Sequence, residues 1–85
     1  MAKKENKERE YLVSIKEYSD EKMAKIFMRI SEELSNNYAM FSRGELVRTN
    51  DWSISYRTTR KREAIDMFCF MHIFGNDIEL TVTEK

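Results

Sequence analysis

The chain has 85 residues, of which 41% are hydrophobic and 35% are charged. This size permits one hydrophobic core and excludes a second, while the apolar content excludes a disordered chain. Fifteen basic residues balance fifteen acidic ones, so the net charge provides no long-range attraction for a polyanion. Recognition of a charged partner would therefore depend on a local cluster of side chains.

The single cysteine and the charged N-terminus limit the class of protein. Cys69 is alone, which excludes an intramolecular disulfide and a cysteine-based metal cage. The first ten residues lack the apolar run of a secretory signal, and no segment reaches the roughly 18 apolar residues of a membrane span. We therefore expect a cytoplasmic protein without membrane association. We interpret residues 1–10 as a mobile charged tail and residues 11–85 as a single α/β domain.

The first two predicted elements are a strand and a helix. Residues 11–16 alternate between two faces, as a strand with one buried face does. Ser19 then provides an N-cap hydroxyl, and the two acids after it suit the positive end of a helix dipole. Apolar residues recur at spacings of three and four from Met23 to Leu34. This pattern predicts an amphipathic helix that ends near residues 35–37.

Short β-prone runs separated by turn signals occupy the middle of the chain. The runs are residues 38–41, 46–49 and 52–57, and the turns are Arg43-Gly44 and Asn50-Asp51. We expect a β-hairpin here. In its second strand Trp52, Ile54 and Tyr56 share one face, which we expect to be the core side.

Residues 59–75 have two interpretations. In the first, Thr58 or Thr59 caps a helix that Gly75 ends in the left-handed conformation. In the second, residues 67–74 form a buried strand, because Phe, Ile and Cys also suit a sheet. A short apolar run does not distinguish the two by its period alone.

The last run, residues 77–83, alternates as a strand with one solvated face. With the helix interpretation the order becomes β-α-β-β-α-β. The predicted fold class is therefore α+β and ferredoxin-like, with two helices on one face of a four-stranded antiparallel sheet. With the strand interpretation, one helix would lie on a β-meander. The fold hosts many unrelated activities, so it does not specify a function.

Basic residues cluster around the start of the second predicted helix. Arginine forks and free helix N–H groups there could bind phosphate or an acidic partner. A solvated helix start balanced by Glu63 and Asp66 explains the same residues. The candidate binding residues are Arg57, Arg60, Lys61 and Arg62, extended by Arg43 and Arg48.

The second predicted helix is apolar nearly all round. Either it fills a crowded core, or it leaves a hydrophobic patch for a protein partner or for a homodimer. The candidate interface residues are Met67, Phe70, Met71 and Phe74.

No residue has the context of a catalyst. We interpret His72, the only histidine, as a hydrogen-bonded structural residue and Cys69 as an inert core thiol. Glu17 and Asp20 follow the first strand, where a small nuclease could bind a metal, but helix capping explains the acids there as well. No catalytic residue, metal site or cofactor is therefore assigned.

We interpret the chain as a small non-enzymatic protein that docks on a larger protein partner and modulates or inhibits it. Such proteins are frequent among phages and mobile elements, and this base rate alone suggests that origin. The first alternative is a nucleic-acid-binding protein that uses the basic residues as a stripe along the phosphate backbone. The second alternative is a small metal-dependent nuclease.

Overall fold

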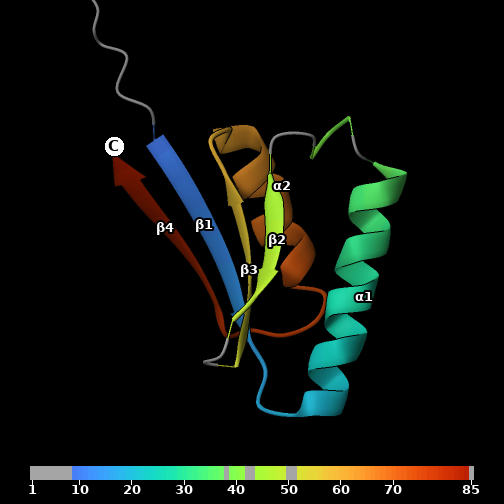
Figure 1. Ribbon diagram of the computed structural model, residues 1–85. Helices are drawn as coiled ribbons and strands as arrows, with labels where there is room; N and C mark the ends of the chain where they lie inside the picture. The colour runs from blue at the N-terminus through green and yellow to red at the C-terminus, as the bar shows by residue number, and fades with distance from the viewer. Residues whose placement is uncertain (1–8, 38, 42–43, 50–51, 85) are drawn as a thin grey trace, which may run out of the picture.

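The computed structural model describes residues 9–37, 39–41, 44–49 and 52–84. Six elements follow one another in the order β-α-β-β-α-β (Figure 1). They are β1 (Arg9–Lys16), α1 (Asp20–Asn36), β2 (Glu45–Arg48), β3 (Ser53–Thr58), α2 (Lys61–Met71) and β4 (Ile78–Glu84). The strands pair antiparallel in the order β2-β3-β1-β4. The predicted α+β ferredoxin-like fold is confirmed.

The core lies between one face of the sheet and the two helices. Alternate residues of the central strands are buried as directly opposed pairs, since alternate side chains share a face. These pairs are Tyr11 with Thr58, Val13 with Tyr56, and Ile15 with Ile54. The helices contribute Met23, Ile26 and Ile30 from α1 and Ala64, Met67 and Met71 from α2.

The opposite face of the sheet is mostly polar, with Leu12 and Val47 as the apolar residues among its described strand positions. The Ser14 and Ser55 hydroxyls are 2.8 Å apart and hydrogen-bonded across β1 and β3. The Arg57 guanidinium pairs with Glu45 on β2 at 3.1 Å and with Glu10 on β1 at 3.8 Å. None of the described strand residues on this face is aromatic, so among them there is no ring on which a nucleic-acid base could stack.

The start of α1 agrees with its sequence signals. Ser19 is the N-cap, and its hydroxyl accepts a hydrogen bond from the Lys22 N–H at 3.4 Å. Asp20 and Glu21 occupy the first turn, where the helix dipole favours acids. The predicted boundary is therefore confirmed.

The first strand starts two residues before the predicted boundary. Arg9 and Glu10 pair with Glu84 and Thr83 of β4, and an ion pair of 3.4 Å joins Arg9 to Glu84. Both positions lie outside the apolar alternation, so only the pairing with β4 identifies them as strand. Of the predicted tail, residues 1–8 lie outside the described residues.

The second helix is confirmed, and the strand interpretation of residues 67–74 is wrong. Its predicted boundaries are also wrong, because the N-cap is Arg60, without a side-chain capping bond. The Thr58 hydroxyl instead accepts from the Arg60 N–H at 3.1 Å. Gly75 does not adopt the left-handed conformation, since neither Gly44 nor Gly75 has a positive φ.

The middle of the chain forms the predicted hairpin with two differences. Residues 39–41 form a turn rather than a strand, while Tyr38 and the Asn50-Asp51 turn lie outside the described residues. Trp52 precedes β3 and is 42% exposed. Ile54 and Tyr56 face the core as predicted, but the prediction for Trp52 is wrong, because its φ of 65° turns the chain before the strand alternation begins.

Candidate functional site

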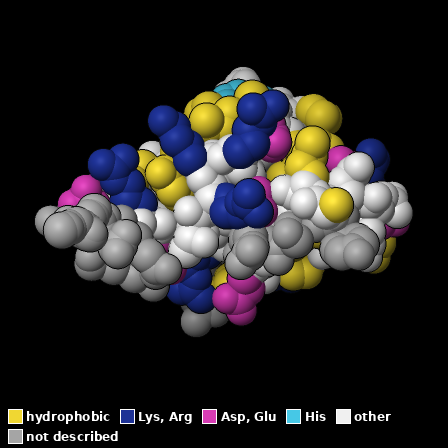
Figure 2. Space-filling view, turned by 90° about the horizontal axis from the view of Figure 1, so that it is seen from above, with side chains coloured by type: hydrophobic (Ala, Val, Ile, Leu, Met, Phe, Trp, Pro, Cys, Tyr) yellow, Lys and Arg dark blue, Asp and Glu magenta, His cyan; other side chains and the backbone are white. Residues whose placement is uncertain are grey.

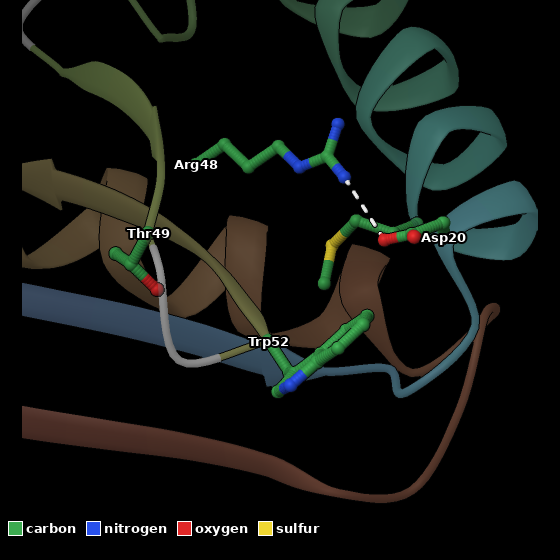
Figure 3. Close-up of a pocket in the computed structure, with 5 residues that line it drawn as sticks. Asp20, Arg48, Thr49 and Trp52 are labelled. Atoms are coloured by element: carbon green, nitrogen blue, oxygen red, sulfur yellow. Dashed lines mark ion pairs between the residues drawn. The ribbon is translucent and has the colours of Figure 1, made fainter.

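An exposed aromatic surface lies where the β2–β3 connection meets the start of α1. We call it the Trp52 surface and define it as Tyr18, Asp20, Arg48, Thr49 and Trp52. The Tyr18 and Trp52 rings are 6.4 Å apart between centroids, and Tyr18 is 65% exposed. Beside them is a pocket of about 390 Å³ lined by Asp20, Met23, Arg48, Thr49 and Trp52. In Figure 3 the Arg48 guanidinium points toward the Asp20 carboxylate.

Hydrogen bonds hold the segments that carry this surface. The Trp52 carbonyl accepts from the Glu17 N–H at 3.0 Å, which ties the start of β3 to the end of β1. The Thr49 N–H donates to the Ser53 carbonyl at 2.9 Å, and the Thr49 and Ser53 hydroxyls are hydrogen-bonded at 2.6 Å. Hydrogen bonds therefore hold the backbone at Thr49 and Trp52.

The backbone of Trp52 is strained. Its φ of 65° lies in the left-handed region, which costs a non-glycine residue about 1–2 kcal/mol, while glycine adopts it freely. Backbone geometry alone would thus favour glycine at this position. Strained residues of this kind concentrate at functional sites. Because the large indole is exposed, folding alone does not explain a tryptophan at this position.

Arg48 and Asp20 form an ion pair across the pocket. The two groups are 3.7 Å apart, and both side chains are substantially exposed. An exposed pair of this kind contributes only about 0–1 kcal/mol. The Arg48 guanidinium can therefore exchange Asp20 for a carboxylate of another molecule at little cost.

A second polar group of residues, the Glu63 cluster, is buried. It consists of Tyr56, Thr58 and Glu63 with the backbone of Phe41 and Gly44. The Tyr56 hydroxyl lies 2.9 Å from both the Glu63 carboxylate and the Phe41 carbonyl, and the Thr58 hydroxyl donates to Glu63 at 3.2 Å. Burial, and then the Glu63 carboxylate, raise the pKa of Tyr56.

We did not predict the Glu63 cluster from the sequence, where we interpreted Glu63 only as a counter-charge to the basic residues at the start of the helix. Glu63 lies three residues after the N-cap Arg60, the position of the acid in a capping box. Here the carboxylate is 3% exposed and turns inward to the Tyr56 and Thr58 hydroxyls. The cluster joins α2 to β3, and only a small part of Glu63 reaches the surface, where it lines a shallow pocket.

The predicted basic residues do not form one stripe. Arg48 lies opposite Ile54 on the helix side of the sheet, whereas Arg57 lies opposite Glu45 on the polar face and at the other end of the β2–β3 pair. Arg62 pairs with Asp66 at 3.5 Å, while Arg60 and Lys61 are exposed. Arg43 lies outside the described residues.

The end of the molecule where β3 leads into α2 carries several cations. Seen from above, Lys and Arg side chains are spread over this end with apolar and acidic side chains between them (Figure 2). A shallow pocket of about 220 Å³ there is lined by Ala39, Met40, Arg60, Arg62 and Glu63. Among the described residues of this end, the cations are therefore interspersed with apolar and acidic side chains.

The predicted interface residues of α2 divide between core and surface. Met67 and Met71 are fully buried in the core, so their assignment to an exposed interface is wrong. The helical period defines two apolar arcs but not which of them meets the sheet. Phe70 and Phe74 are half-buried and pack edge to face at 5.4 Å. Phe74 also lines an apolar groove of about 350 Å³ against α1.

The residues considered as a catalyst, a core thiol or a metal ligand have the following positions in the structure. The His72 ring is exposed, and its Nδ1 is hydrogen-bonded to the Phe68 carbonyl at 2.8 Å. Cys69 is exposed, so its prediction as a core thiol is wrong. Glu17 Oε1 accepts from the Ser19 N–H at 3.2 Å. Within the described ranges, no group of three or more His, Cys, Asp or Glu residues could hold a metal ion.

Neither helix of the described part of the chain is long and apolar enough to cross a membrane. Comparison of the chain with protein families, curated proteins and solved structures found no match. The protein is therefore defined by its fold, an α+β ferredoxin-like domain, and the case for its function depends on its own surfaces.

Proposed function

We propose that this chain is a small protein-binding domain that docks on a larger protein through the Trp52 surface and modulates or inhibits that protein by covering part of it. One observation carries the proposal. Trp52 keeps a half-exposed indole at a strained φ of 65°, beside the exposed Tyr18 ring and the Arg48 guanidinium. Trp, Tyr and Arg are the residues that dominate the binding energy of protein interfaces.

The pocket supports a specific mode of docking. Its wall combines the Trp52 indole with the charged pair Arg48 and Asp20, and Met23 lies at its buried side. An apolar side chain of the partner would pack against Trp52, while a neighbouring carboxylate would take the place of Asp20 on Arg48. The hydrogen-bonded backbone beneath reduces the entropy lost on binding.

Nucleic-acid binding is the alternative that the same experiments test. The proposal favours a protein partner because none of the described strand residues on the open face of the sheet is an aromatic ring on which a base could stack and because the net charge is zero. A non-enzymatic role, cytoplasmic location, a phage or mobile-element origin and homodimer formation remain predictions, and a small metal-dependent nuclease remains the second alternative.

The test is capture of a partner by the tagged full-length chain from a lysate of its native host, with and without nuclease. We expect one protein in stoichiometric amount that survives nuclease treatment. Trp52→Gly should weaken its binding about 30-fold or more, the effect of removing an interface hot spot of about 2 kcal/mol. Glycine suits the backbone at this position, so the variant should remain folded.

Met40→Ser is the matched control, because Met40 is another exposed apolar residue and lines the pocket at Arg60 and Arg62, not the pocket at Trp52. Its binding should equal that of the unmodified chain. Equal capture by Trp52→Gly and the unmodified chain would contradict docking through this surface. Recovery of nucleic acid, with proteins lost after nuclease, would replace the proposal with nucleic-acid binding.

A further inference from the structure

The outer edge of β4 is a second surface with the features of a binding site. β4 spans seven residues, and among the described strands only β1 pairs with it, so its other side is open (Figure 1). Leu80 and Val82 are 36% and 50% exposed, although they lie opposite the buried Val13 and Tyr11 on the helix side of the sheet. This edge therefore combines open backbone groups with exposed apolar side chains.

The pairing with β1 determines which backbone groups of β4 are open. The Lys16 N–H donates to the Asp77 carbonyl at 3.0 Å, and these residues are opposite each other when the β1–β4 register is extended by one pair. Hydrogen-bonded pairs alternate along an antiparallel ladder, so the odd-numbered residues of β4 bond to β1. The N–H and C=O groups of Ile78, Leu80 and Val82 point outward.

The other edge of the sheet is different. β2 has four residues, it begins and ends with the charged Glu45 and Arg48, and its two central residues are half-buried. Short, charged edge strands resist pairing with other chains, whereas a long regular edge with apolar side chains invites it. β4 is therefore the edge at which the sheet can be extended.

We propose that β4 pairs with β4 of a second copy of this chain, which forms an antiparallel homodimer with a continuous eight-stranded sheet. The outward backbone groups must face each other, so even-numbered residues oppose even-numbered ones. A two-fold axis at Leu80 places Leu80 opposite Leu80 of the second copy and Ile78 opposite Val82. Each apolar residue on the helix side then meets another apolar residue.

Charge supports this register. On the polar face, Glu79 lies opposite Thr81 of the second copy, so no two carboxylates are directly opposed. Moving the axis to Glu79 would oppose two carboxylates, which destabilises a sheet. Moving the axis to Thr81 or Val82 would oppose Glu84 to Ile78 or to Leu80. The axis at Leu80 avoids both conflicts, and it leaves the Trp52 surface, which involves neither β1 nor β4, open for a partner.

The first test is the mass of the purified full-length chain in solution by sedimentation equilibrium. We expect a dimer that dissociates on dilution. Leu80→Lys should abolish the dimer, and Leu80→Pro should also abolish it without disrupting the β1–β4 ladder, because the lost N–H points outward. Circular dichroism should show both variants folded. Ile73→Lys, at a more exposed apolar residue outside β4, should remain dimeric.

Two results would overturn the dimer. One is a monomer at all concentrations up to about 1 mM, where dimers with a millimolar Kd are still populated. The other is a dimer that both Leu80 variants leave intact. Loss of a separate partner at the Trp52 surface would not alter either result, so the two proposals fail independently.

The second test distinguishes the possible registers, because one substitution strengthens the dimer in the proposed register and weakens it in another. Thr81→Lys would place the new lysine opposite Glu79 of the second copy, twice in each dimer. The dimer should then bind about 2-fold to 30-fold more tightly, from two opposite-charge pairs across the strands, and the gain should shrink at high salt. With the axis at Thr81, the two lysines would face each other, so a weaker dimer would overturn the proposed register.

Discussion

The two ends of β3 carry the same residue types in opposite environments. At its start, the Trp52 surface combines aromatic rings with a carboxylate in contact with solvent. At its end, the Glu63 cluster combines an aromatic ring with a carboxylate that is 3% exposed. In the buried cluster each hydroxyl has a partner in the protein, while the Arg48–Asp20 ion pair at the exposed surface is solvated and weak.

This contrast separates the region that stabilises the protein from the surface at which we propose that it binds. A buried polar group without a hydrogen-bond partner destabilises the folded state, so substitutions in the Glu63 cluster should lower the free energy of unfolding. An exposed ion pair contributes little, so the Trp52 surface should tolerate substitution without loss of the fold. The following changes test this difference in order of expected size.

Gly44→Ala should have the largest effect. A Cβ atom at position 44 would coincide with the ring and hydroxyl of Tyr56, so the cluster would have to open. We expect a loss of about 3 kcal/mol in the free energy of unfolding, measured by urea denaturation.

Gly75→Ala is the matched control for that change. A Cβ atom there would meet only the Ile15 side chain at 3.8 Å, and the φ of Gly75 is not positive. Its free energy of unfolding should change by about 0.5 kcal/mol or less. Equal losses in the two variants would show that Gly44 is not required by the cluster.

Tyr56→Phe should cost about 2 kcal/mol. The change removes the hydroxyl beside the Glu63 carboxylate and the Phe41 carbonyl and leaves both buried acceptors with fewer donors. Tyr18→Phe, at the exposed surface, should change the free energy of unfolding by less than about 0.5 kcal/mol. If the two variants were equally stable, the distinction between the two regions would be wrong.

The stability of the protein should fall in strong base. The folded state raises the pKa of Tyr56 above its ordinary value, so the unfolded chain releases this proton first, and ionisation favours unfolding above pH about 10. The Tyr56 contribution is fully present below that pH and decreases by about 1.4 kcal/mol per pH unit above it. Denaturation of the unmodified chain and of Tyr56→Phe at pH 9 to 11 isolates this effect, which the variant should lack.

The smallest effect concerns the backbone at Trp52. Trp52→Gly should be about 1 kcal/mol more stable than Trp52→Ala, because only glycine adopts a φ of 65° without strain. At most positions an alanine variant is more stable than a glycine variant. Thermal or urea denaturation of both variants measures the difference, and a less stable glycine variant would contradict a strained backbone at this residue.

Much of the fold was predictable because local patterns and tertiary packing agree. The alternation of Tyr11, Val13 and Ile15 and the capped helix after Ser19 define β1 and α1. The start of β1 was missed, since Arg9 and Glu10 belong to the strand only through β4. For residues 59–75 the sequence left a helix and a strand open, and only the structure shows the helix α2 with Met67 and Met71 buried against the sheet.

The candidate site was less predictable than the fold. Arg48 and Arg57 are close in sequence, yet strand alternation and the hairpin place them on opposite faces. Trp52 has the parity of a core residue, and its positive φ, which no local pattern signals for a tryptophan, turns it outward. Glu63 appears in sequence as one charge among many, and only its burial beside Tyr56 gives it a structural role.

The sequence by itself therefore determined β1, α1, the β2–β3 hairpin and β4, the alternation of polar and apolar residues along β1 and β4, and the absence of a net charge. These properties depend on residues within one turn or one strand of each other, where spacing fixes geometry. The tertiary structure decided which apolar residues remain exposed, which charges pair, and which strand edge stays open. Those properties depend on contacts between segments far apart in the chain, and no local spacing encodes them.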